Sequence, residues 1–276
     1  MKPNLSRIAF YPVPIRLGIF ILTLLIIWLP LAAPIDFLLK DDPNLVTILT
    51  MGLLFIEFLF LLRFWGKKVY QQPHLHKSYG LEFSRKNGVE LLNGLSIGIL
   101  FTLALFAIEG IVGWVTFQTP SVSLLRIVAE GLLSALGIGL AEEFVFRGWL
   151  LNELERDYSA KTALWIDAIL FAVLHFLKPI EEVIRTFPAF PGLLLLGLTL
   201  VWAKRNHRGR LGISIGLHAG LVWGYYIVNV GELIQYSDTV SPWITGVDKN
   251  PIAGILGLLF LSILAYWMRQ ESSQKL

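Results

Sequence analysis

Long apolar runs recur along this chain of 276 residues, and they constrain its fold more than any other feature. An α-helix needs roughly 20 mainly apolar residues to cross the hydrocarbon layer of a membrane. Eight runs approach or reach that length, and the fifth and sixth are short enough for a partly re-entrant course. They lie at residues 17–34, 45–62, 92–116, 122–150, 162–177, 187–203, 211–231 and 251–268. We therefore expect an all-α polytopic membrane helix bundle with about eight transmembrane helices.

Composition supports a membrane protein and excludes several kinds of chemistry. Charged residues make up 16% of the chain, against about 25% in soluble domains. The sequence contains no cysteine, which excludes disulfides, thiolate nucleophiles and cysteine-ligated zinc. Because no internal repeat or low-complexity linker is present, we expect one membrane domain over residues 1–276.

Basic side chains divide unevenly between the two sides of this predicted topology. If the N-terminus is cytoplasmic, most of the 23 Lys and Arg residues fall on the cytoplasmic side, including the cluster from Lys204 to Arg210. The opposite loops hold only Lys40, Lys178, Arg185 and Lys249. This positive-inside pattern predicts a multi-pass protein of the cell membrane or an internal membrane, with both termini cytoplasmic. Basic loops beside anionic lipid are favourable, so we expect membrane lipids and no nucleic acid as partners.

Four ionisable residues inside the predicted spans are the candidate functional residues. They are Glu142, Glu143, His175 and His218, and such groups cost roughly 2.5 to 3.5 kcal/mol each within a membrane helix. The remaining histidines fall in basic loops, where a solvated role explains them.

The two glutamates have different neighbours on their predicted helix. Glu143 precedes Arg147 by four residues, which is the favourable orientation for an ion pair. Glu142 lies about 100° around the helix, so it stays the less neutralised carboxylate and the better proton acceptor. An ion cluster that only packs the helices together is the alternative interpretation.

Helix geometry indicates which of these residues can meet. Glu142 and His175 each lie about 14 residues from the cytoplasmic end of their spans, so they reach a similar depth in an antiparallel pair. His218 lies only about eight residues into its span, and it fits that depth less well unless the loop before it dips inward.

Two kinds of hydrolytic site use this set of residues. A carboxylate can activate water with imidazole assistance, or His175, His218 and Glu142 can hold a divalent metal such as Zn²⁺. The sequence has neither HExxH nor GxSxG, and no other cofactor is expected. A proton-coupled transporter is disfavoured, because the chain lacks interrupted apolar segments in matching halves.

Two of these segments resemble motifs of a known family. EEFVFR, from Glu142 to Arg147, resembles an EExxxR motif, and FAVLH, from Phe171 to His175, resembles an FxxxH motif. The EExxxR and FxxxH motifs are those of the CAAX-processing and bacteriocin-processing (CPBP, abortive-infection) family of intramembrane proteases. The family's third motif, a His followed four residues later by Asn or Asp, would begin at His218, but this chain has Val222 at the fourth position. The family-like catalytic core is expected at about residues 122–233.

The resemblance implies a role for each residue. Glu142 would be the general base that activates water, and Glu143 and Arg147 its supporting pair. His175 would bind or orient the water, and His218 would stabilise the tetrahedral oxyanion. The family's Asn shares this last task, which Val222 cannot perform; losing one such donor typically costs about 10²- to 10³-fold in turnover.

We therefore expect an intramembrane endopeptidase whose cavity is formed by the fourth, fifth, sixth and seventh spans. Its substrate would be a membrane-associated protein or peptide, including CAAX-like proteins and peptide precursors. The alternative is a catalytically degenerate membrane scaffold or immunity-type protein with the same fold.

Overall fold

A computed structural model describes residues 5–120 and 122–274. The described residues fall into two compact units, divided after Ser78. The expectation of one membrane domain stays a prediction.

The first unit is a hairpin of two long helices. Its second helix begins with Pro43, which needs no backbone donor in the first turn, and Asp42 accepts a hydrogen bond from the Leu45 amide at 3.0 Å. The elements are a 3₁₀ turn (Leu5–Phe10), α1 (Val13–Leu38), α2 (Pro43–Lys68) and the single turn α3 (Leu75–Ser78).

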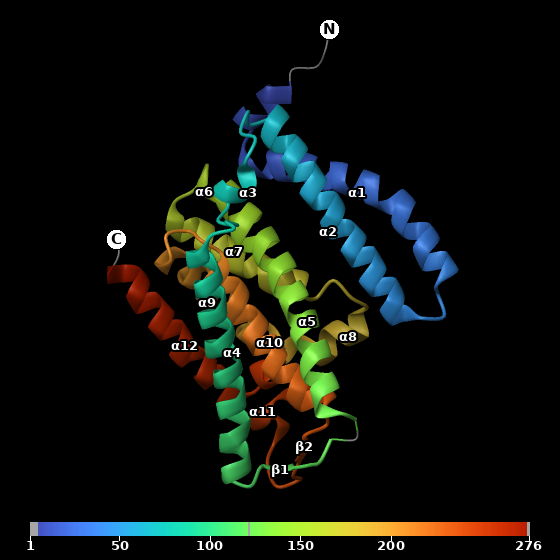
Figure 1. Ribbon diagram of the computed structural model, residues 1–276, viewed down its shortest axis with the longest axis vertical. Helices are drawn as coiled ribbons and strands as arrows, with labels where there is room; N and C mark the ends of the chain where they lie inside the picture. The colour runs from blue at the N-terminus through green and yellow to red at the C-terminus, as the bar shows by residue number, and fades with distance from the viewer. Residues whose placement is uncertain (1–4, 121, 275–276) are drawn as a thin grey trace. The chain divides into compact units, whose positions relative to one another are not determined.

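The second unit is a helical bundle that contains every candidate functional residue (Figure 1). Its first half comprises α4 (Arg85–Ile111), β1 (Val115–Phe117), α5 (Leu124–Glu143), a π-helical segment (Phe144–Leu150), α6 (Leu151–Glu155) and α7 (Ala160–Leu174). Its second half comprises α8 (Ile180–Thr186), α9 (Phe190–Asn206), α10 (Gly212–Val230), β2 (Ile234–Tyr236), α11 (Pro242–Thr245) and α12 (Ile255–Gln274), with short 3₁₀ turns at Phe187–Ala189, Val247–Lys249 and Pro251–Ala253.

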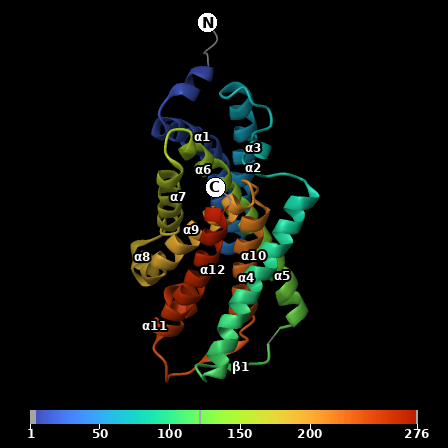
Figure 2. The ribbon, with the colours of Figure 1, turned by 90° about the vertical axis from the view of Figure 1, so that its left-hand side faces the viewer.

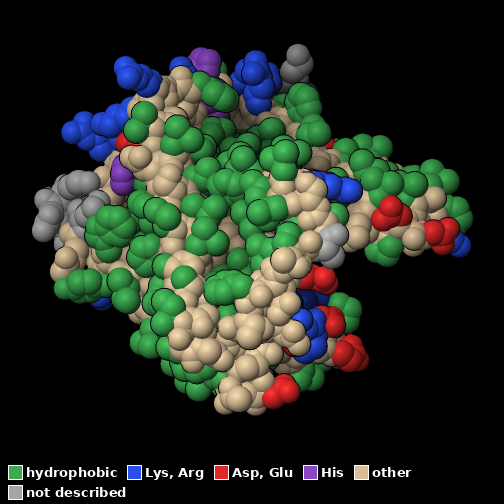
Figure 3. Space-filling model, turned by 60° about the horizontal axis from the view of Figure 1, so that its bottom comes forward, with side chains coloured by type: hydrophobic (Ala, Val, Ile, Leu, Met, Phe, Trp, Pro, Cys, Tyr) green, Lys and Arg blue, Asp and Glu red, His purple; other side chains and the backbone are tan. Residues whose placement is uncertain are grey.

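The predicted all-α membrane bundle is confirmed. Among the described residues, six helical segments are long and apolar enough to cross a membrane. Helix α7 and the apolar part of α12 are shorter, so the span number of eight and the cytoplasmic placement of the termini stay predictions. Apolar side chains are spread over the face of the molecule in Figure 3, as expected for a surface in contact with lipid.

One predicted span ends earlier than expected. The run 92–116 was expected to be helical throughout, but α4 ends at Ile111, and Gly113 adopts a positive φ of 77°. The following residues Val115–Phe117 form β1, which pairs antiparallel with Ile234–Tyr236. Apolar β-branched residues suit a strand as well as a helix, and hydropathy alone does not distinguish them.

Helices α4 and α10 approach so closely that only glycine fits between them. Gly94 and Gly98 of α4 face backbone atoms of α10, while Gly216 and Gly220 of α10 face backbone atoms of α4. A methyl group at Gly216 would lie 1.9 Å from the carbonyl oxygen of Leu91. The two helices lie side by side in Figure 1 and Figure 2. Such small-residue stripes let membrane helices pack backbone to backbone, and this contact fixes the position of α10.

Replacing Gly216 with Ala is expected to push α4 and α10 apart. We expect a loss of about 1 to 3 kcal/mol in the free energy of unfolding, the usual range for overpacking. Gly137 of α5 is the matched control, since nothing lies within 4 Å of a methyl group placed there. Thermal unfolding in detergent measures both variants, and equal stability of the two would contradict the proposed close contact.

Candidate active site

The two candidate glutamates end α5, and the helix changes its winding directly after them. Residues Phe144–Leu150 form a π-helix, with hydrogen bonds that reach five residues along the chain. The sequence predicted a regular α-helix here. The expected ion pair nevertheless forms, because Nη1 of Arg147 donates to Oε1 of Glu143 at 3.1 Å. π-Helical turns are rare in proteins, and those that are found lie frequently at functional sites.

Arg147 is completely buried and bonded on several sides. Its Nη2 donates to the Gly197 carbonyl of α9 at 3.2 Å. Its guanidinium carbon lies 4.1 Å from the centre of the Phe171 ring, a cation–π contact that contributes on the order of 2 kcal/mol when desolvated. The same ring lies 4.6 Å from the His175 ring, so Phe171 separates the guanidinium from the imidazole.

Two further charged residues join this cluster, and sequence analysis did not identify either as functional. Oδ2 of Asp167 on α7 lies 3.5 Å from Nε of Arg147, with both side chains fully buried. Nζ of Lys204 donates to the Arg147 carbonyl at 2.5 Å. The sequence placed Lys204 just beyond the sixth span, but α9 continues to Asn206, and Lys204 is only 5% exposed. Its cytoplasmic side stays a prediction.

A sequence signal for Asp167 was present. It is an ionisable residue inside the fifth apolar run, and it lies four residues before Phe171 and eight before His175. Residues at these intervals share one face of a helix.

His218 reaches the glutamates, although its depth seemed unfavourable. Its Nδ1 lies 3.0 Å from Oε1 of Glu143, and since an ionised carboxylate only accepts, Nδ1 is the donor. Its Nε2 lies 3.9 Å from Oε2 of Glu142. Leu211 and the first turns of α10 are buried, so this helix begins inside the bundle. Residues 207–210 just before it are half-buried or exposed, and a loop that dips inward stays a prediction.

His175 approaches Glu142 from the other side. Nε2 of His175 lies 3.7 Å from Oε2 of Glu142, and both side chains are about one-third exposed. Nδ1 of His175 lies 2.7 Å from the Phe171 carbonyl, which can only accept, so Nδ1 carries a proton. Nε2 of each imidazole thus lies within 4 Å of the same carboxylate oxygen.

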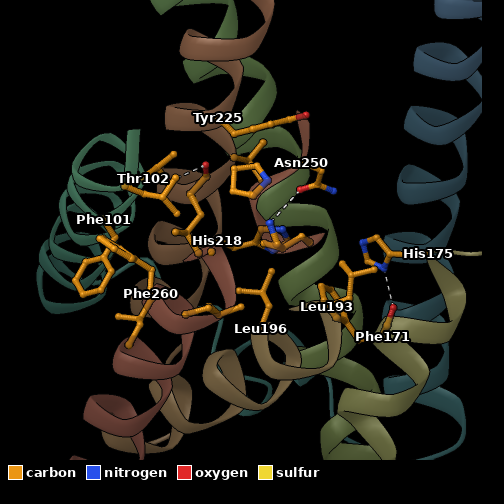
Figure 4. A pocket seen from close by; sticks show the side chains of 18 residues that line it. Phe101, Thr102, Phe171, His175, Leu193, Leu196, His218, Tyr225, Asn250 and Phe260 are labelled. Carbon is orange, nitrogen blue, oxygen red and sulfur yellow. Dashed lines mark hydrogen bonds between the residues drawn. The ribbon is translucent and has the colours of Figure 1, made fainter. Parts of the chain in front are cut away.

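The two histidines line a cavity of about 290 Å³ (Figure 4). Most of its wall is apolar, and Val222 forms part of it. The expected cavity lay between the fourth to seventh spans. The observed wall takes residues from α7, α9 and α10 but none from the fourth span, whose Glu142 lies within 4 Å of the two lining histidines. The wall also includes α4, α12 and the 3₁₀ turn Pro251–Ala253. Contacts between segments far apart in the sequence place these elements at the cavity, and the spacing of motifs does not predict such contacts.

The tentative metal site with His175, His218 and Glu142 gains no support from the geometry. Over the described ranges 5–120 and 122–274, no three His, Asp or Glu side chains form a group suited to hold a metal ion.

Comparison with known proteins agrees with the motifs. Residues 122–224 match the family described as type II CAAX prenyl endopeptidase Rce1-like. The matched segment contains both EEFVFR and FAVLH, and the match confirms the resemblance drawn from them. No curated protein and no solved structure was found to match the chain significantly.

Removing the buried guanidinium should destabilise the bundle strongly. Arg147→Met leaves Glu143 and Asp167 as buried carboxylates without their main cation, and we expect a loss of about 3 to 5 kcal/mol in the free energy of unfolding. Arg126→Met is the matched control, since Arg126 pairs with Glu130 at an exposed site on α5, where about 1 kcal/mol or less is expected. Chemical denaturation in detergent compares them, and similar losses would show that the buried cluster is not structural.

Proposed function

We propose that this protein is an intramembrane endopeptidase in which Glu142 activates a water molecule with the help of His175. The Rce1-like domain at residues 122–224 supports the protease class. The residues that carry the reaction and the nature of the substrate are our proposal.

The observation that carries this proposal is the position of one carboxylate oxygen. Oε2 of Glu142 has no hydrogen-bond partner among the described residues, and two imidazole nitrogens lie 3.7 and 3.9 Å from it. These separations are too long for direct hydrogen bonds and suit a bridging water molecule. Oε1 of Glu143 accepts from Arg147 and contacts His218, while its Oε2 is also without a partner. The side chain of Glu143 is fully buried, however, whereas that of Glu142 is about one-third exposed. Glu142 is therefore the carboxylate free to accept a proton.

The proposed reaction begins with water held between Glu142 and Nε2 of His175. Glu142 takes one proton while the water oxygen bonds to the peptide carbonyl carbon, and the carbonyl electron pair moves to its oxygen. When the carbonyl re-forms, the carbon–nitrogen bond breaks, and Glu142 returns the proton to the leaving nitrogen. Glu143 holds the His218 ring in place, as Arg147 holds Glu143.

The substrate that fits this site best is a membrane-associated protein or peptide. The cavity wall is mainly apolar, so it favours chains whose residues beside the cleaved bond are apolar or lipid-modified. The family description supports testing CAAX-type prenylated peptides together with unmodified peptide precursors.

Cleavage should disappear in two variants that keep the fold. The purified protein in lipid vesicles is offered a library of membrane-associated peptides, half of them prenylated at a C-terminal CAAX sequence, and products are identified by mass spectrometry. Glu142→Gln and His175→Ala are expected to abolish cleavage, because they remove the base and the residue that orients water. Unchanged melting temperatures are expected, since both side chains are partly exposed and neither forms a buried ion pair.

Matched controls separate this effect from a general loss of charge. Glu130→Gln changes another glutamate of the same helix α5, and His74→Ala changes an exposed histidine. Both variants should keep full activity. Cleavage that persists in Glu142→Gln, or no cleavage by the unmodified protein, would contradict the proposal.

A degenerate scaffold or immunity-type protein is the second candidate function, favoured by one observation. Val222 lies on the cavity wall close to His218 and offers no hydrogen bond to a reacting carbonyl. This function predicts that the unmodified protein cleaves none of the library peptides, whereas Val222→Asn gains cleavage. The same mass spectrometric assay distinguishes it from the peptidase.

A further inference from the structure

Two side-chain donors in the active-site cavity are unused, the amide of Asn250 and the hydroxyl of Tyr225. Thr102, His175 and His218 each donate a hydrogen bond to a protein oxygen. Asn250 also lines the cavity, and its Oδ1 accepts a hydrogen bond from the Ile252 amide at 3.3 Å. Its Nδ2 forms no hydrogen bond within the described part of the chain, so the two hydrogens of this amide are available to a bound molecule.

The backbone that carries Asn250 is held tightly in place. A methyl group at Gly192 of α9 would lie 2.3 Å from the Ile252 carbonyl oxygen, and one at Gly257 of α12 would lie 1.9 Å from that of Pro251. A methyl group at Gly246 would meet the carbonyl oxygen of Asn250 at 2.3 Å. Glycines on three sides thus allow close packing around residues 250–252. A donor fixed before the reaction stabilises developing charge without reorganising.

The reaction needs such a donor. Negative charge develops on the substrate oxygen beside the carboxylate Glu142 and inside a mainly apolar cavity. His218 uses Nδ1 for Glu143, so its Nε2 donates only when the ring is protonated. The neighbouring Val222 offers no donor. An amide N–H donates regardless of pH, and it carries no charge that the apolar cavity would have to accommodate.

We propose that Asn250 is a catalytic residue whose Nδ2 donates a hydrogen bond to the oxyanion formed during peptide hydrolysis. The inference rests on the proposed function and assigns the task that Val222 cannot perform to a residue 28 positions further along the chain. In the view of Figure 4 the Asn250 side chain lies between those of Tyr225 and His175.

Tyr225 is the competing donor in this cavity. Its hydroxyl oxygen accepts from Nδ2 of Asn229 at 2.9 Å, which leaves its hydrogen free. It lies seven residues after His218 on α10, about 10 Å along the helix axis. That separation is too great for Tyr225 and His218 to contact one oxygen together, so we expect Tyr225 to be dispensable.

Three variants test the assignment with the peptide that the unmodified protein cleaves fastest in vesicles. Asn250→Ser keeps a side-chain oxygen that can cap the turn, and Asn250→Asp keeps the acceptor for the Ile252 amide; neither retains the amide donor. Both should lower kcat by about 10²- to 10³-fold, with KM changed less than about threefold and the melting temperature unchanged. Tyr225→Phe removes the competing donor and should lower kcat far less than Asn250→Ser. Glu130→Gln, at an exposed site on α5, is the control and should keep kcat within about threefold.

A second-site change separates donation from packing. Val222→Asn in the Asn250→Ser background places an amide on the same cavity wall. The double variant should have a kcat at least tenfold higher than that of Asn250→Ser alone. A purely structural role of Asn250 would give no such rescue, so no recovery would overturn the assignment. It would also be overturned by full activity of Asn250→Ser, or by a loss in Tyr225→Phe as large as that in Asn250→Ser.

Failure of this inference differs visibly from failure of the proposed function. Cleavage that requires Glu142 but not Asn250 would overturn the inference alone. Cleavage that is absent in the unmodified protein, or independent of Glu142, would overturn the proposed function itself.

Discussion

The ion pair between Arg147 and Glu143 is the contact on which the rest of the site depends. Both side chains are fully buried, so each carries a desolvation cost that only a bonded partner offsets. Arg147 also bonds to α9 through Gly197 and stacks on Phe171 of α7, while Glu143 bonds to His218 of α10. A single guanidinium–carboxylate contact thus joins four segments of the bundle.

This arrangement gives the two adjacent glutamates opposite properties. Glu143 is held between a cation and an imidazole, where a proton transfer would break the contacts that join the helices. Glu142 is one-third exposed, whereas Glu143 is fully buried. Glu142 can therefore gain and lose a proton without disturbing the bundle. Stability and proton transfer are separated between neighbours in the sequence, since successive residues point in different directions around a helix.

Local patterns in the sequence were sufficient to predict the membrane helices and the Arg147–Glu143 pair, because these depend on apolar length and on four-residue spacing. What the sequence missed depends on nonlocal packing. The burial of Lys204 and the reach of His218 follow from where α9 ends and α10 begins inside the bundle. The β-ribbon requires a partner more than a hundred residues away. The place of Asn250 in the cavity wall depends on contacts with α9 and α12. The motifs near Glu142 carry no information about these contacts.

The π-helical segment makes the site sensitive to chain length as well as to residue type. A π-turn accommodates one more residue than an α-turn, so Phe144–Leu150 sets the angle between the glutamates and the residues that follow them. Removing one residue there would favour α-helical winding and change which side chains of the segment face Glu143. Insertions and deletions within EEFVFRGWL would therefore separate the carboxylates from their cation even if every functional residue were kept.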